Sequence, residues 1–171
     1  MRKGGKPRMD AVRNALDELP HRIAEEVERA GLTVALAESL TCGNLTGNLG
    51  KGENTGEWLS GGIVAYLTEI KQSVLGVSEG PVVSARCAEE MAAGAAKLFD
   101  ADLTVSTTGA GGPGSLEGQP AGTVFIGWSL RGETGHAKHS FDGGPAEILE
   151  QTEAAALQQL LDLAQKAEDL G

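Results

Sequence analysis

The sequence predicts an α/β protein whose fold is a three-layer α/β/α sandwich on a mixed, mostly parallel central sheet. Short apolar runs typical of buried strands alternate along the chain with amphipathic helical patterns, which favours parallel strands joined by helices. Two later apolar runs are separated only by a short turn, which adds an antiparallel pair. A length of 171 residues, with 25 glycines and 4% aromatic residues, indicates one domain packed mainly by small side chains.

The amino-terminal part of the chain is expected to be a disordered lead at residues 1–8, followed by a single domain at residues 9–171 that opens with a helix. Apolar side chains recur at helical spacing from Val12 to Ala30, and Gly31 is expected to end this helix. Pro20 predicts a kink or a restart within it, because proline fits a helix only in the first turn.

Two buried strands are predicted next. The first is the apolar run Thr33–Ala37, and a short helix is expected after it through Leu45 and Leu49. A glycine-rich, polar loop at residues 50–56 then follows, which we interpret as a rim or lid. The second strand is Ser60–Tyr66, opened by glycines.

Two helices are predicted after the second strand. Thr68 is expected to cap a short one, with Lys71 at its third position and an end near Gly76. Ser84 is expected to cap a long amphipathic helix. The buried face of that helix is predicted to consist of Ala88, Met91, Ala92, Ala95, Leu98 and Phe99.

The last part of the chain is predicted to complete the sheet. Leu103–Thr107 is expected to be a strand that runs into the glycine-rich loop Thr108–Gly114. Strands at Thr123–Leu130 and His136–Phe141 flank a turn at residues 131–135. A closing helix is indicated by an apolar face made of Ile148, Thr152, Ala155, Ala156, Leu160 and Leu163.

Composition and charge exclude several classes of function. A net charge of −10 argues against a nucleic-acid interface and against binding to anionic membranes, so the expected partner is a small molecule. Cys42 and Cys87 form no C-x-x-C motif, and His136 and His139 would face opposite sides of one strand, so no metal site is expected. No run approaches the roughly 18 apolar residues of a membrane span and no signal peptide is recognisable, which predicts a cytoplasmic protein.

Three polar turns follow predicted strands, at residues 38–43, 66–71 and 107–114, and they meet if these strands are parallel neighbours. Ser39 is then a candidate nucleophile. Lys71 is a candidate base, because an ammonium near a helix N-terminus in a poorly solvated pocket has a lowered pKa. The glycine-rich loop would offer backbone N–H groups to an oxyanion or a phosphate.

Other residues of these turns are candidate contacts to a substrate. Tyr66, together with Trp58 and Trp128, is a candidate for stacking on a flat heterocycle. The residues that we assign to substrate binding are Glu38, Thr41, Gly43, Tyr66, Gly109, Gly111 and Gly112.

Each of these assignments has a structural alternative. Ser39 would equally serve as the cap of the following helix, and Lys71 as a solvated helix residue. The glycine-rich loop would equally serve as a tight crossover. Cys42 is a rival nucleophile with an intrinsically better sulfur, although a thiol at a helix N-terminus is more often structural.

Taken together, several segments resemble the CinA carboxy-terminal domain family, the family of nicotinamide mononucleotide amidohydrolases. They are A-E-S-L-T-C-G at residues 37–43, G-G-I-V-A-Y-L-T-E-I-K at 61–71, V-S-A-R-C-A-E-E-M-A-A-G at 83–94, T-G-A-G-G-P-G at 108–114 and P-A-G-T-V at 120–124. The resemblance implies hydrolysis of the carboxamide of nicotinamide mononucleotide to nicotinate mononucleotide and ammonia. Family members often carry this module behind a nucleotide-processing domain, and residues 1–30 are too short for one, so we expect a module that stands alone.

By the same resemblance, Ser39 matches the family's serine, Lys71 its lysine and Thr108 its threonine. Ser39 would attack the carboxamide carbon while Lys71 takes its proton, and backbone N–H groups with the Thr108 hydroxyl would hold the oxyanion before water cleaves the ester. Glu38 would orient Ser39 or a neighbouring donor. No metal and no cofactor are required, and the partner is a small-molecule nucleotide. The composition is compatible with a homo-oligomer, since small Ala- and Gly-rich α/β enzymes often self-associate, but it does not give the oligomeric state.

Two arginine positions of the family pattern carry other residues in this chain. After the last strand the family has approximately F-x-G-D-R with a second arginine four residues later, whereas Pro145 and Leu149 stand at the two arginine positions here. An arginine facing a phosphate supplies a charge-assisted contact, and its loss costs on the order of 2 to 4 kcal/mol. We therefore hold two hypotheses: an active amidohydrolase, and a diverged member that binds a nucleotide-like ligand or a partner without turnover.

Overall fold

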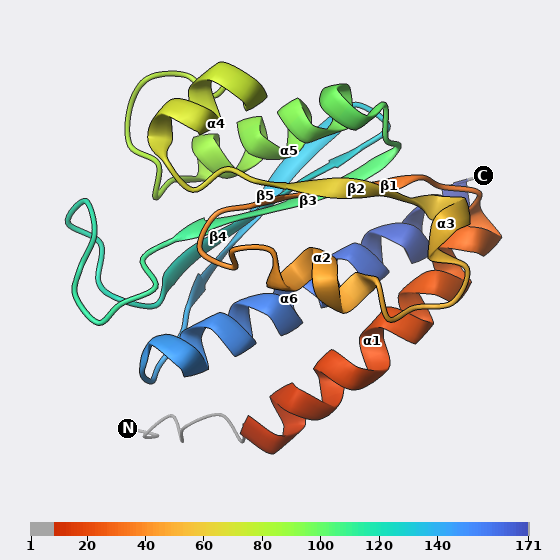
Figure 1. Ribbon diagram of the computed structural model, residues 1–171, viewed down its shortest axis with the longest axis horizontal. Helices are drawn as coiled ribbons and strands as arrows, with labels where there is room; N and C mark the ends of the chain where they lie inside the picture. Colours follow the sequence, from red (N-terminus) through yellow and green to blue (C-terminus); the bar gives the residue numbers. More distant parts are fainter. Residues whose placement is uncertain (1–8, 171) are drawn as a thin grey trace.

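The computed structural model describes residues 9–170, and the lead expected at residues 1–8 lies outside them. Helices and strands alternate along most of the described chain (Figure 1). The helices are α1 (Met9–Ala30), α2 (Asn44–Leu49), α3 (Thr55–Trp58), α4 (Thr68–Leu75), α5 (Ala85–Phe99) and α6 (Pro145–Leu170). The strands are β1 (Val34–Glu38), β2 (Leu59–Val64), β3 (Leu103–Gly109), β4 (Thr123–Leu130) and β5 (Glu133–Ser140).

The strands form one mixed sheet in the order β2-β1-β3-β4-β5. β1 lies in the middle of the parallel part and pairs with both β2 and β3. β4 and β5 extend the sheet by antiparallel pairing. The mixed sheet expected from the sequence is confirmed, and its three parallel strands are the ones whose carboxyl ends carry the polar turns.

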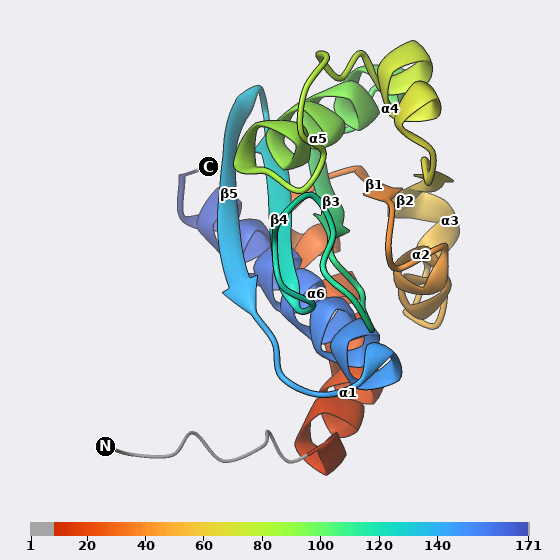
Figure 2. The ribbon, with the colours of Figure 1, turned by 90° about the vertical axis from the view of Figure 1, so that its left-hand side faces the viewer.

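Helices cover both faces of the sheet, which confirms the three-layer sandwich (Figures 1 and 2). α5 packs on one face with α4 beside it, and α6 packs on the other face with α1 on its outer side. The larger apolar core lies on the α6 side, where Leu36, Val105 and Ile126 of the sheet are fully buried. No helix within residues 9–170 combines the length and the hydropathy that crossing a bilayer demands.

The α4–α5 contact depends on a glycine. A Cβ atom at Gly94 of α5 would collide with the backbone carbonyl of Leu75, the last residue of α4. Glycine at this position therefore lets α4, which carries Lys71, lie directly against α5.

Several helix boundaries predicted from the sequence are confirmed. α1 ends before Gly31, whose φ is +65°. The restart predicted at Pro20 was wrong, because α1 continues through Pro20 as one helix. Ser84 is the N-cap of α5, because its hydroxyl oxygen accepts a hydrogen bond of 3.1 Å from the Cys87 backbone N–H.

β2 differs from the buried strand predicted at Ser60–Tyr66. It spans Leu59–Val64 at the edge of the sheet, and every second residue is exposed. An edge strand has a neighbour on one side only, so it is less completely covered than the central strand β1. Tyr66 lies beyond the end of β2 and is exposed.

Three smaller predictions were also wrong. Leu67 rather than Thr68 is the N-cap of α4, so Lys71 is its fourth residue. Leu98 is exposed, because it lies in the last turn of α5 and is outside the contact with the sheet. The turn before β5 comprises only Arg131 and Gly132, which both have positive φ and so close a tight hairpin.

Candidate active site

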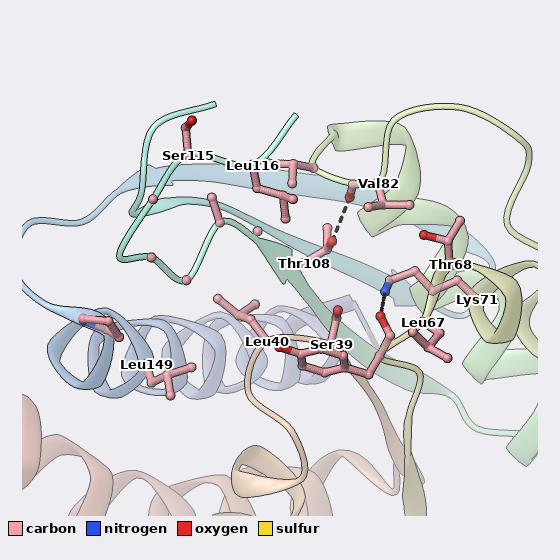
Figure 3. Close-up of a pocket in the computed structure, with 18 residues that line it drawn as sticks. Ser39, Leu40, Leu67, Thr68, Lys71, Val82, Thr108, Ser115, Leu116 and Leu149 are labelled. Atoms are coloured by element: carbon pink, nitrogen blue, oxygen red, sulfur yellow. Dashed lines mark hydrogen bonds between the residues drawn. The ribbon is translucent and has the colours of Figure 1, made fainter. Parts of the chain in front are cut away.

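The turns after β1, β2 and β3 converge because β1 lies between the other two strands and all three are parallel. Ser39 follows β1, Tyr66 follows β2 and Thr108 lies near the end of β3. With the loop at residues 110–122 and the first turns of α6, they enclose a pocket of about 570 Å³ (Figure 3). The structure thus brings all three candidate catalytic residues, Ser39, Lys71 and Thr108, into the lining of one pocket.

Lys71 lines this pocket from α4 and is only 2% exposed. Its Nζ donates a hydrogen bond of 2.7 Å to the backbone carbonyl of Tyr66 (Figure 3). Burial lowers the pKa of the Lys71 ammonium below its ordinary 10.5, while the Cys87 thiol and the Glu117 carboxylate act in the opposite direction. Lys71 is therefore not a solvated helix residue but a buried amine that loses its proton more readily than an exposed lysine.

Ser39 is held by its backbone and leaves its hydroxyl to the pocket. Its N–H donates to the Thr107 carbonyl at 3.1 Å, and its carbonyl accepts from the Cys42 N–H at 3.1 Å. Within residues 9–170 its Oγ has no hydrogen-bond partner. Ser39 does not cap the next helix, since Gly43 occupies the N-cap of α2.

Thr108 is almost fully buried, and its hydroxyl donates to the Val82 carbonyl at 2.7 Å (Figure 3). That proton is available to an oxyanion only if the hydroxyl turns away from Val82. Gly111 and Gly112 line the same pocket, and their N–H groups have no backbone partner among the described residues. They are the better candidates for an oxyanion site.

Of the residues assigned to substrate binding, four line the pocket: Tyr66, Gly109, Gly111 and Gly112. Glu38, Thr41 and Gly43 do not. The Thr41 hydroxyl is buried in a hydrogen bond of 2.8 Å with the Thr107 hydroxyl, and Gly43, with φ of +94°, turns the chain into α2.

The Glu38 carboxylate is completely buried and binds the start of α2. It accepts hydrogen bonds from the N–H groups of Leu45 at 2.8 Å and Thr46 at 2.9 Å, and from the Thr46 hydroxyl at 2.6 Å. The Glu38 carboxylate is thus bound to α2, makes no hydrogen bond to Ser39 among the described residues and is absent from the lining of the pocket.

Other sequence candidates lie away from the pocket. Cys42, the rival nucleophile, is exposed outside the lining. Trp58 is buried in the core, where its indole N–H donates to the Glu53 carbonyl, and neither Trp128 nor the expected lid at residues 50–56 contributes to the pocket. Residues 9–170 contain no group of three or more His, Cys, Asp or Glu side chains placed to hold a metal ion.

Sequence reasoning did not identify the apolar and loop residues of the lining. Val82 and Val83, which lie before α5, form part of it, as does Leu116 of the loop. Glu117 ties that loop to the valines, because its carboxylate accepts from the Val82 N–H at 2.9 Å and from the Val83 N–H at 2.6 Å. The only sign of this contact in the sequence was a single acidic residue, Glu117, in the loop that contains the glycines.

Comparisons with family models and with known protein sequences agree with one another. A family model described as CinA C-terminal domain matches residues 16–164. A protein named competence-damage inducible protein from Listeria monocytogenes is 41% identical over 119 residues, which cover 67% of this chain and 29% of that protein. A protein of the same name from Bacillus pumilus is 40% identical over 142 residues, covering 80% and 34%. The chain thus spans about a third of the length of these relatives.

Solved structures share the fold. A CinA superfamily protein from Escherichia coli has a TM-score of 0.84 and 34% identity, covering 86% of this chain and 90% of that one. Another from Klebsiella pneumoniae has a TM-score of 0.85 and 30% identity, covering 88% and 98%.

Proposed function

The chain belongs to the CinA C-terminal domain family, and we propose that its pocket hydrolyses a carboxamide with Ser39 as nucleophile and Lys71 as general base. The observation that carries the proposal is a buried lysine amine, held by one carbonyl, that lines the same pocket as a serine hydroxyl with no hydrogen-bond partner within residues 9–170. Burying an ammonium with so few partners is costly, and such perturbed groups in pockets mark sites of chemistry.

The neutral form of Lys71 suits the role of base. A neutral amine keeps two N–H bonds, one of which donates to the Tyr66 carbonyl and fixes the position of Nζ. Its lone pair then takes the proton of Ser39 while Oγ forms a bond to the carboxamide carbon. The carbonyl oxygen becomes an oxyanion, for which the N–H groups of Gly111 and Gly112 are the proposed donors.

The remaining steps return the site to its starting state. The tetrahedral intermediate breaks its C–N bond, and Lys71 passes its proton to the nitrogen, which leaves as ammonia. Water then attacks the ester on Ser39 and gives a proton to Lys71, and the C–O bond to Ser39 breaks as Lys71 passes that proton to Oγ. The products are a carboxylic acid and the free serine.

The substrate implied by the family resemblance is nicotinamide mononucleotide, converted to nicotinate mononucleotide and ammonia. A pocket of about 570 Å³ lies in the range of small-molecule sites. Tyr66, exposed at its rim, offers a flat ring against which a pyridine can stack.

The test is ammonia release from nicotinamide mononucleotide and from simpler aromatic carboxamides by the full chain. Ser39→Ala and Lys71→Ala should each lower turnover by about a thousandfold or more. Lys51→Ala is the matched control, because Lys51 is exposed and lies outside the pocket. Turnover that survives Ser39→Ala would refute the nucleophile assignment.

A second candidate function is binding without turnover. It is favoured by the position of Lys71, whose Nζ donates to Tyr66, with no hydrogen bond to Ser39 among the described residues. In that case neither the unaltered chain nor Ser39→Ala would release ammonia, and both would bind the same ligand equally.

A further inference from the structure

The pocket contains one charged side chain, and the proposed reaction already uses it. Lys71 is the only Lys, Arg, Asp or Glu in the lining formed by the described residues. Two arginines elsewhere are engaged with carboxylates: Arg86 donates to Glu90 at 2.8 Å and Arg13 to Glu150 at 3.0 Å. Among residues 9–170, a phosphate that entered the pocket would therefore find no cation in the lining other than Lys71 to pair with.

The end of the pocket away from Lys71 is apolar. In Figure 3 Leu149 lies on the opposite side from Lys71, with Ser39 and Leu40 between them. Leu149 and Pro145 both line this end and come from the first turns of α6. Their side chains offer neither charge nor hydrogen bonds to a ligand.

The start of α6 is also a poor anion site. Pro145, its first residue, has no N–H. The Glu147 carboxylate packs against Gly143, just before the helix, and so places a negative charge where a helix would attract an anion. A phosphate would have to displace this carboxylate or lie beside it.

The rim of the pocket favours an apolar ligand. Tyr66, Leu67 and Leu116 are 63%, 64% and 46% exposed, and all three line the pocket. A ligand that covers them removes their apolar surface from water, which favours binding. The Glu117 carboxylate, bound to the Val82 and Val83 N–H groups behind this rim, adds a further negative charge.

We propose, building on the amidohydrolase function above, that the substrate is a carboxamide with an apolar body and no phosphate, and that Leu149 sets this preference. The amide end lies between Ser39 and Lys71, and the body lies against Leu40, Leu116 and Leu149. The N–H groups of Gly111 and Gly112, which have no backbone partner within residues 9–170, serve an uncharged or transient oxygen rather than a permanent dianion. The phosphate of nicotinamide mononucleotide is then the part of that molecule for which the pocket has no partner.

The test is a calorimetric titration of the Ser39→Ala full chain, which separates binding from turnover. The ligands are nicotinamide mononucleotide, the corresponding riboside that differs only by the phosphate, and benzamide. The riboside and benzamide should bind at least about tenfold more tightly than the mononucleotide. Adding Leu149→Arg should tighten the mononucleotide at least about tenfold and should not tighten benzamide, because only the phosphate gains a charged partner. Leu149→Met is the control and should keep the original order.

Two results would overturn the proposal: tighter binding of the mononucleotide than of the riboside while Leu149 is present, or no binding of any of the three amides. The amidohydrolase function fails separately. If the chain with Ser39 intact binds the riboside and benzamide in preference to the mononucleotide but releases no ammonia from any amide, hydrolysis is refuted and the pocket's ligand preference is supported.

Discussion

Glu38 and Lys71 are both charged side chains buried at the carboxyl edge of the same sheet, and their surroundings are opposite. Three donors bind the Glu38 carboxylate, which is 0% exposed and lies outside the pocket. One carbonyl binds the Lys71 amine, which lines the pocket and has a lowered pKa because of burial. A buried charge with a full set of hydrogen bonds stabilises the fold, whereas one with an incomplete set beside a pocket is available for chemistry.

The sharpest test of this difference is Lys71→Met. Ammonia release should fall by about a thousandfold or more, because the base is lost. The free energy of unfolding should change by less than about 1 kcal/mol, since removing a poorly bonded buried amine offsets the loss of its hydrogen bond to Tyr66. Urea unfolding and steady-state turnover measure the two effects. A loss of about 3 kcal/mol with turnover retained would mean that Lys71 is structural.

Glu38→Gln should show the opposite behaviour. The amide NH₂ group would face the N–H donors of Leu45 or Thr46, so the free energy of unfolding should fall by about 2 to 4 kcal/mol. Turnover per folded molecule should stay within about tenfold, because Glu38 is outside the pocket. Glu28→Gln, at an exposed position of α1, is the control and should change stability by less than about 0.5 kcal/mol. Unchanged stability in Glu38→Gln would remove the contrast with Lys71.

The pH dependence of turnover tests the environment of Lys71. A base acts in its deprotonated form, so kcat/KM should rise with pH through the Lys71 pKa and level off below the ordinary 10.5, because burial lowers that pKa. Glu117→Gln removes a carboxylate that raises the Lys71 pKa, so the rise should move to lower pH. Glu133→Gln, on β5 and outside the pocket lining, should leave the profile unchanged. A shift to higher pH in Glu117→Gln would contradict the assignment of Lys71 as the titrating base.

Glu153 is intermediate between Glu38 and Lys71 in the hydrogen bonding of its buried side chain. Of the substitutions considered, its replacement should have the smallest effect. It is 5% exposed and accepts from the Asn44 amide at 2.9 Å and the Asn48 amide at 3.3 Å, and burial raises its pKa above 4.5. The folded chain therefore keeps a proton on Glu153 at a pH where the unfolded chain has lost it, so stability falls as pH rises through this interval. Glu153→Gln should raise the free energy of unfolding at neutral pH by less than about 1 kcal/mol, and this gain should shrink at mildly acidic pH. Equal gains at both pH values would show that the charge of Glu153 has no part in the effect.

The sequence was most informative where structure depends on neighbouring residues. Gly31 ends α1 and Ser84 caps α5, because left-handed backbone and N-cap hydrogen bonds involve residues within one turn. The end of β1 was found for a similar reason, since an apolar run that stops at Glu38 is visible in the chain itself, whereas β3 continues past the predicted end at Thr107 to Gly109. The prediction failed at β2, because an edge position depends on which strand lies next to it.

Within the site, the sequence by itself determined that Ser39, Lys71 and a glycine-rich loop follow strand ends. Because β2 and β3 both pair in parallel with β1, the fold brings these three segments together. Only the tertiary structure decided that Glu38 binds α2, that the Thr108 hydroxyl donates to Val82, and that Leu149 closes the far end of the pocket. Each of these contacts joins groups from different elements, and the energy of a buried polar or apolar group depends on the partner it meets there, which local sequence does not specify.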